Sequence, residues 1–203
     1  MIDYLMELGA KLVVDEDNYC RAMYLAVANG HLHTVKHLES LGVSLHFSKE
    51  KSLVMKSLSN NHEDIFYYLK EKGLEILVKN KENKSTLMKA AQNNMFDIVA
   101  LLIKEGAMPL NKNNKGFTAF QLAAIKDHKE TIKVFIENDV KIYKLNDEEM
   151  LQVMKLMDNN IEFFGKDFVE KAMSDSFVKA VNKKKNLSVK YMINRGIDIH
   201  MVN

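Results

Sequence analysis

Apolar residues recur along this chain at helical spacing, in short stretches that end at glycine or asparagine. One kind of stretch carries apolar or small side chains at positions i, i+3 and i+4, as at Leu87, Ala90 and Ala91. A second kind carries them three residues apart, as at Val99 and Leu102. Both spacings place these side chains on one face of a helix. The pattern therefore predicts pairs of short amphipathic helices.

Two series of residues mark where these helices are expected to end. Most members of each series follow one another after 33 residues, and glycine, asparagine and aspartate tolerate the left-handed backbone of a helix end. The helix that closes each pair is expected to end at Gly9, Gly42, Gly73, Gly106, Asp139, Ala172 and Gly196. The helix that opens each pair is expected to end at Gly30, Asn61, Asn94, Asp127, Asn160 and Lys184.

No single helix pair of this size can bury its apolar face, so successive pairs are expected to stack on one another. The sequence therefore predicts an all-α solenoid of about six helix–turn–helix units, with a partial unit at the N-terminus. All residues from 1 to 203 are assigned to one domain. The expected units are approximately residues 1–12, 13–45, 46–76, 77–109, 110–142, 143–173 and 174–203.

Two stretches carry a recognisable signature within this repeat. Residues 85–91 read Ser-Thr-Leu-Met-Lys-Ala-Ala, and residues 118–124 read Thr-Ala-Phe-Gln-Leu-Ala-Ala. With the 33-residue period, they resemble the Thr-Pro-Leu-His-x-Ala signature of ankyrin repeats. The resemblance implies stacked helix pairs with protruding fingers and a concave binding face. The histidine of the signature is replaced throughout, the loop between Ala172 and Phe177 lacks most of a finger, and residues 146–173 are the least typical unit.

Composition narrows the chemistry that the chain can perform. The 203 residues carry a formal net charge of +2 and one cysteine, which excludes a disulfide framework and fits a reducing intracellular setting. We find no signal peptide, phosphate-binding loop, catalytic triad motif or paired-cysteine motif. Cys20 has no evident catalytic partner, and His33 and His37 lack a third metal ligand. We therefore predict no enzyme activity, no metal and no cofactor.

The most informative surface signal is a row of lysines on the opening helices and in the fingers. In the ankyrin arrangement these positions lean toward the concave face, where a basic groove would attract an acidic partner. Phe117 and Ile125 are apolar at positions that usually face a ligand in that family. The alternative is that the lysines are ordinary solvated side chains. The predicted partner-binding residues are Lys81, Glu82, Lys84, Lys89, Gln92, Asn93, Asn114, Lys115, Phe117, Ile125 and Lys126.

These observations favour a non-catalytic protein–protein interaction module, located inside the cell and in the cytoplasm. Its expected partner is a protein, acidic if the lysine row forms a groove, and no membrane span is expected. A basic groove for nucleic acid or another anionic ligand is the alternative, although the near-neutral charge argues against nucleic acid. A targeting part of a larger enzyme or effector is a further alternative. The degenerate repeats are similar to ankyrin proteins of large DNA viruses, intracellular bacteria and protists. The sequence leaves the partner, the oligomeric state and any longer parent chain open.

Overall fold

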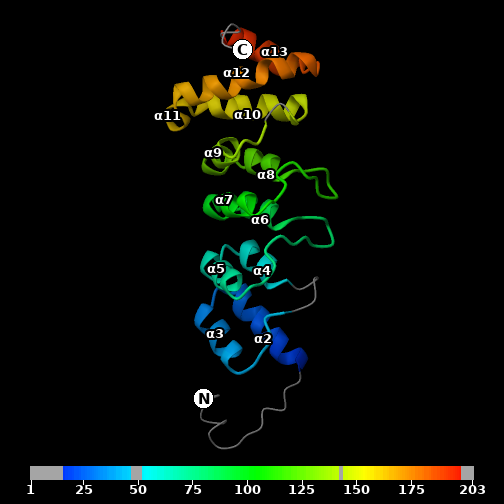
Figure 1. The fold of residues 1–203 in the computed structure, drawn as a ribbon, viewed down its shortest axis with the longest axis vertical. Helices are drawn as coiled ribbons and strands as arrows, with labels where there is room; N and C mark the ends of the chain where they lie inside the picture. Colours follow the sequence, from blue (N-terminus) through cyan, green and yellow to red (C-terminus); the bar gives the residue numbers. More distant parts are fainter. Residues whose placement is uncertain (1–15, 47–51, 142–143, 198–203) are drawn as a thin grey trace, which may run out of the picture. The chain divides into compact units, whose positions relative to one another are not determined.

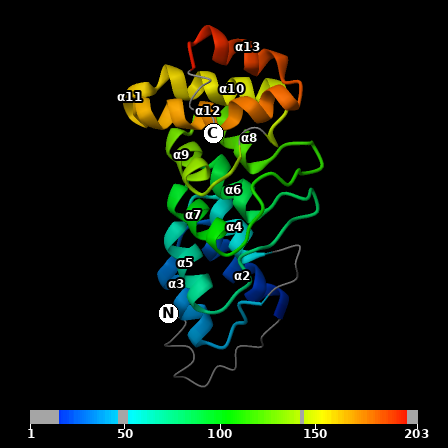
Figure 2. The same ribbon diagram turned by 45° about the horizontal axis from the view of Figure 1, so that its top comes forward.

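The computed structural model describes residues 16–46, 52–141 and 144–197, and the fold is drawn in Figures 1 and 2. The partial unit expected at residues 1–12, with Gly9, lies outside the described residues. Within the described residues all regular structure is helical, except one isolated bridge between Lys79 and Ser85. The predicted all-α class is confirmed. The chain divides into two compact units, residues 1–75 and 76–203, which are described separately.

The first unit contains two helix pairs. They are α2 (Glu16–Ala28) with α3 (Leu32–Ser40), and α4 (Leu53–Ser59) with α5 (Glu63–Glu71). Opening helices α2 and α4 pack against each other. The side chain of Asn60 donates a hydrogen bond of 2.6 Å to the Ala28 carbonyl, and the His62 ring donates one of 3.0 Å to the same oxygen. The second pair thus satisfies a carbonyl at the end of the first pair's opening helix.

The second unit begins with two regular pairs. They are α6 (Thr86–Gln92) with α7 (Phe96–Lys104), and α8 (Ala119–Ile125) with α9 (Lys129–Glu137). Opening helix α6 packs against α8, and closing helix α7 packs against α9. The His128 ring donates to the Ala91 carbonyl at 3.0 Å, which repeats the His62 contact of the first unit. Successive pairs are therefore joined by hydrogen bonds as well as by apolar contact.

Four of the described opening helices begin in one common way. A serine, threonine or asparagine precedes the helix, and its side chain accepts a hydrogen bond from the amide three residues later. This contact satisfies one of the four amides that a helix start leaves without an intrahelical acceptor. The capping residues are Ser52, Ser85, Thr118 and Asn146.

The helix ends follow the predicted series closely. Five ends of opening helices have positive φ between 54° and 75°, at Gly30, Asn61, Asn94, Asp127 and Lys184. Five ends of closing helices have positive φ between 63° and 95°, at Gly42, Gly73, Gly106, Asp139 and Gly196. The left-handed positions that the repeat period implies are thus confirmed at all these residues.

A helix does end at Asn160, as predicted, but the left-handed conformation expected there is wrong, because this residue has φ −121°. It follows α10 (Asp147–Asn159), and its side chain donates to the Leu156 carbonyl at 2.8 Å. The chain continues directly into the single turn α11 (Ile161–Phe164). The left-handed residue comes afterwards, at Gly165 with φ 84°, where glycine adopts this conformation without steric cost.

The helix end predicted at Ala172 is also wrong. Helix α12 runs without interruption from Lys166 to Asn182, and Ala172 is buried in its middle. No glycine or proline interrupts this stretch, and the Ser176 hydroxyl bonds to the Ala172 carbonyl at 2.9 Å inside the helix. Two helices expected on either side of Ala172 are therefore one helix, and no finger separates them.

The last helix, α13 (Asn186–Asn194), lies along α10 and runs parallel to it. At its start, the Asp147 carboxylate accepts hydrogen bonds from the amides of Leu187 and Ser188, at 2.8 and 2.9 Å. Toward its end, Asp158 accepts from the Tyr191 hydroxyl at 2.8 Å and from Arg195 Nε at 2.6 Å. Burial, followed by contact with Asp158, raises the pKa of Tyr191 to about 12. Two aspartates of α10 thus hold α13 in place.

Glycine 30 provides a test of the left-handed turns. Its φ is +75°, and an added Cβ would lie 2.6 Å from the ring of His62, which is held by its bond to Ala28. We expect Gly30→Ala to lower the free energy of unfolding by about 2–3 kcal/mol, from the left-handed conformation and the clash together. Urea unfolding followed by circular dichroism measures this loss.

The matched control is Gly42→Ala, because Gly42 has φ +86° and open space around its Cβ position. It should lose about 1 kcal/mol, from the backbone conformation alone. Adding His62→Ala to Gly30→Ala should remove the additional cost of the clash. Equal losses for the two glycine variants would contradict the proposed clash.

Aspartate 147 provides a test of the α13 attachment. Burial would raise its pKa, but hydrogen bonds from Leu187 and Ser188 outweigh burial and lower the pKa below its ordinary value. A lowered pKa in the folded state means that the stabilisation is complete above the unfolded value and is lost as pH falls through the folded value. We expect Asp147→Asn to lower the free energy of unfolding by about 1–2 kcal/mol at pH 7.

The same variant should also show a smaller loss of stability than the wild type between neutral and acidic pH. Glu148→Gln is the control, because it removes a charge from the same exposed first turn of α10. Urea unfolding across this pH range provides the comparison. If both variants behave alike, the contacts of Asp147 with α13 contribute nothing specific.

Candidate partner-binding site

Two loops that lead into α6 and α8 form narrow fingers. In the first finger (residues 76–85), the Asn80 amide donates to the Lys84 carbonyl at 3.0 Å, and Asn83 turns the chain with φ 55°. The side-chain oxygen of Asn80 accepts from the amides of Glu82 and Lys84, at 3.0 and 2.9 Å. These contacts fix the backbone of a tip that would otherwise be free to move.

The second finger (residues 109–118) is built around the buried side chain of Asn113. Its oxygen accepts from the amides of Lys115 at 2.9 Å and Phe117 at 3.0 Å. The Asn113 amide donates to the Phe117 carbonyl at 2.9 Å, and Gly116 takes φ 83° at the turn. One asparagine therefore organises both sides of the finger.

Hydrogen bonds also join the two fingers to each other. The Asn114 amide donates to the Glu82 carbonyl at 3.1 Å, and the Asn114 side chain donates to the Lys81 carbonyl at 3.3 Å. The Asn83 side chain donates in the opposite direction, to the Lys112 carbonyl at 2.9 Å. The fingers thus form one connected row, in which the backbone of each finger is held in place relative to the other.

Three of the predicted lysines act on the carboxylate of Glu82, which is itself a predicted residue. Lys84 Nζ lies 2.6 Å from Glu82 Oε2. The hydrogen bond from Lys84 lowers the pKa of Glu82 first, followed by the charge of Lys84 and then the charges of Lys115 and Lys89. The Glu82 carboxylate neutralises part of the lysine charge, and the group of four residues remains positive because it contains three lysines and one acid.

The remaining predicted residues lie at the far ends of the opening helices. Gln92 ends α6 and Asn93 caps it, whereas Ile125 ends α8 and Lys126 caps it. The Ile125 side chain is 55% exposed. Since seven helical residues span about 10 Å, Lys89 on α6 lies between these ends and the fingers. Phe117 is half-buried within the second finger.

Comparison with known protein families identifies the repeat. Residues 53–146 match ankyrin repeats in three copies. The match begins at the first residue of α4 and ends at Asn146, which caps α10. Residues 53–146 are ankyrin repeats. The comparison with curated proteins found no match. Both fingers and every predicted partner-binding residue lie inside the matched range, and ankyrin repeats are generally protein–protein interaction modules.

Other candidate chemistry falls outside this surface. Cys20 lies in α2, and His33 and His37 lie in α3. Among the residues that the structure describes, no group of three or more histidine, cysteine, aspartate or glutamate side chains is placed to hold a metal ion. No helix of the described part is long and apolar enough to cross a membrane.

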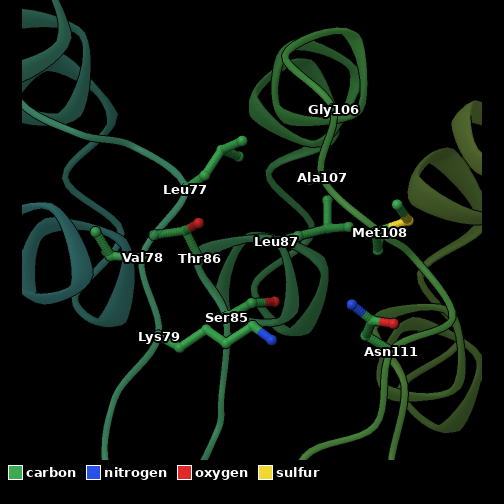
Figure 3. Close-up of a pocket in the computed structure, with 10 residues that line it drawn as sticks. All are labelled: Leu77, Val78, Lys79, Ser85, Thr86, Leu87, Gly106, Ala107, Met108 and Asn111. Atoms are coloured by element: carbon green, nitrogen blue, oxygen red, sulfur yellow. The ribbon is translucent and has the colours of Figure 1, made fainter.

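Two exposed apolar residues at the bases of the ankyrin fingers were not predicted from the sequence. Leu77 is 39% exposed and Met108 is 67% exposed, and both line a pocket at the base of the first finger (Figure 3). In the close-up, Leu77 and Met108 lie on opposite sides, with Leu87 between them. Met108 precedes the single proline of the chain, so its loop position was evident from the sequence, but its exposure was not.

The second ankyrin finger offers a test of local order. We expect Asn113→Ala to free the amides of Lys115 and Phe117, because the variant lacks the oxygen that accepts from both. Their hydrogen–deuterium exchange should become about tenfold faster, because the free energy of local opening should fall by about 1–2 kcal/mol. The Asn80 finger supplies the internal reference.

The Glu82 and Lys84 amides, which Asn80 holds, should exchange in Asn113→Ala within about twofold of their wild-type rate. Unchanged exchange at Lys115 and Phe117 would show that Asn113 does not organise the finger. A uniform increase in both fingers would instead indicate that the two tips open together.

Proposed function

We propose that this chain is a non-catalytic protein-interaction module that binds an acidic partner protein through its fingers and opening helices. The observation that carries the proposal is the lysine cluster around Glu82, held on two fingers that are hydrogen-bonded to each other. Because the backbone of this row is fixed, binding requires little additional ordering of the fingers. Its positive charge speeds the encounter with an acidic surface.

The proposed binding face is concave and extends from the finger tips to the ends of α6 and α8. Lys84 and Lys115 supply charge at one end, and exposed Ile125 supplies an apolar contact at the other. An apolar side chain surrounded by polar groups is a common anchor at protein interfaces. The lysines would attract such a partner before contact, and Ile125 would be buried once the complex has formed.

We favour a protein over a nucleic acid as the partner. Nucleic-acid grooves combine many cations with aromatic side chains for stacking. Here Glu82 cancels part of the positive charge, and the one aromatic residue of the predicted face, Phe117, is half-buried. The single cysteine agrees with an intracellular, cytoplasmic setting. A role as the targeting part of a larger effector is compatible with the same surface.

Charge reversal at Lys81, Lys84, Lys89 and Lys115 tests the proposal. The variant should retain about tenfold less of the proteins that the wild-type chain captures from a cell lysate. Capture should also weaken as salt concentration rises, because the attraction is electrostatic. Mass spectrometry of the retained proteins measures both effects.

The matched control reverses four exposed lysines outside this face, Lys104, Lys166, Lys171 and Lys190. It changes the net charge equally and should retain the same partners as the wild type. If the finger variant and the control retain identical proteins, the proposed face is not the binding surface. Salt-sensitive binding to DNA or RNA by the wild type, without a protein partner, would favour the nucleic-acid alternative.

A further inference from the structure

Two pockets lie side by side at the bases of the loops in the second unit. The first has a volume of about 150 Å³ and is lined by Leu77, Val78 and Lys79 on one loop and by Ala107, Met108 and Asn111 on the next. The second, of about 290 Å³, is lined by Met108, Leu110 and Asn111 and by Val140, Lys141 and Lys144 on the following loop. We name them the loop-base pockets.

The loop-base pockets are the same site in two successive repeats. Residues that line the first pocket recur in the second after 33 positions: Leu77 as Leu110, Ala107 as Val140, and Asn111 as Lys144. Met108 and Asn111 line both pockets, so they form the wall between them. The repeat of the chain has therefore produced a repeated cavity.

Their size and lining suit apolar side chains. A cavity of about 150 Å³ is large enough for a benzene ring, and the second pocket is larger. Leu77 and Met108 are exposed at the first pocket, as Figure 3 shows. The flexible, polarisable side chain of methionine adapts its shape to different apolar partners. None of the eleven residues predicted to bind a partner lines either pocket.

The charged residues that line the pockets indicate what kind of segment would bind there. Three lysines line the pockets, Lys79 in the first and Lys141 and Lys144 in the second, against one acid, Asp139. Lys141 forms an ion pair with Asp139, which neutralises that acid. The pair of pockets is therefore net positive, and acidic residues beside the bound apolar side chains would complement it.

The distance between repeats defines the conformation of the bound segment. Neighbouring packed helices lie about 8–10 Å apart. An extended chain in the polyproline II conformation has three residues per turn and advances about 9 Å in that turn. Side chains three residues apart then point in the same direction at the repeat spacing. A segment that crosses from one loop to the next can therefore fill both pockets.

We propose that the loop-base pockets bind an extended acidic segment of a partner protein, which places two apolar side chains three residues apart, one in each pocket. This surface is separate from the finger lysines, so it adds a second contact to the module or recruits a second partner. The two sites can be tested independently on the intact chain.

The probe is the fluorescein-labelled peptide Asp-Glu-Ser-Leu-Glu-Ser-Leu-Glu-Asp, titrated with the full chain and followed by fluorescence anisotropy. A second peptide, Asp-Glu-Ser-Leu-Glu-Leu-Ser-Glu-Asp, has the same composition with leucines two residues apart. A third peptide replaces every acidic residue of the first by lysine. We expect the first peptide to bind about tenfold more tightly than either of the others.

The decisive variant is Met108→Glu, since a side chain that is 67% exposed can be changed without loss of the fold. It should weaken binding of the first peptide by about tenfold or more, because it adds a like charge to the wall of both pockets. The matched control is Ile193→Glu, which alters an apolar residue of α13 that is 58% exposed and lies outside both proposed surfaces, and it should leave the affinity unchanged. Circular dichroism confirms that both variants are folded.

Three results with the wild type and Met108→Glu would overturn the proposal. They are equal affinity for the two leucine spacings, equal affinity of wild type and Met108→Glu, and no saturable binding of the first peptide up to about 1 mM. The finger variant with four reversed lysines should still bind the first peptide. Its failure to do so would place the acidic peptide on the finger lysines and would also overturn the assignment to the loop-base pockets.

Discussion

The structure depends on burial between neighbouring helices, because the helices themselves are too short to persist alone. Helices α4, α6 and α8 have seven residues each, and isolated helices shorter than about 12–15 residues are marginal in water. Their stability comes from apolar side chains that adjoining helices cover. Small residues such as Ala90 and Ala123 are fully buried and let α6 and α8 approach closely. Every other feature of the repeat serves to present these faces to one another.

Turn chemistry is the part of the fold that the sequence predicts best. A left-handed residue depends on its own backbone and on its immediate neighbours, so Gly106 and Asp127 could be placed from spacing and residue type. His62 and His128 follow two of these turns, and both bond to the preceding pair. Local propensity and the repeat period agree at these positions, which makes the prediction secure.

The C-terminal part could not be predicted because long-range contacts decide it. Nothing near Asp147 in sequence indicates that its carboxylate caps a helix that starts 39 residues later, at Asn186. At Ala172 the period suggested a helix end, but a strong helix former without a nearby glycine or proline continues the helix. The candidate site, too, has features that the sequence predicts and features that depend on long-range contacts. Residue types identified the lysines, whereas the pairing of Lys84 with Glu82 and the exposure of Met108 emerged only from the fold.

The continuous helix α12 has a consequence for how this end of the array comes apart. In a regular solenoid a terminal repeat can fray by itself, because it touches only one neighbour through an interface that opens at a flexible loop. Here no flexible joint exists between residues 166 and 182, and α13 is attached to α10 rather than only to its own helix partner. Local unfolding of α12 and α13 would therefore expose α10 at the same time. Helices α10, α12 and α13 should therefore melt as one block, which protects this segment from stepwise local unfolding.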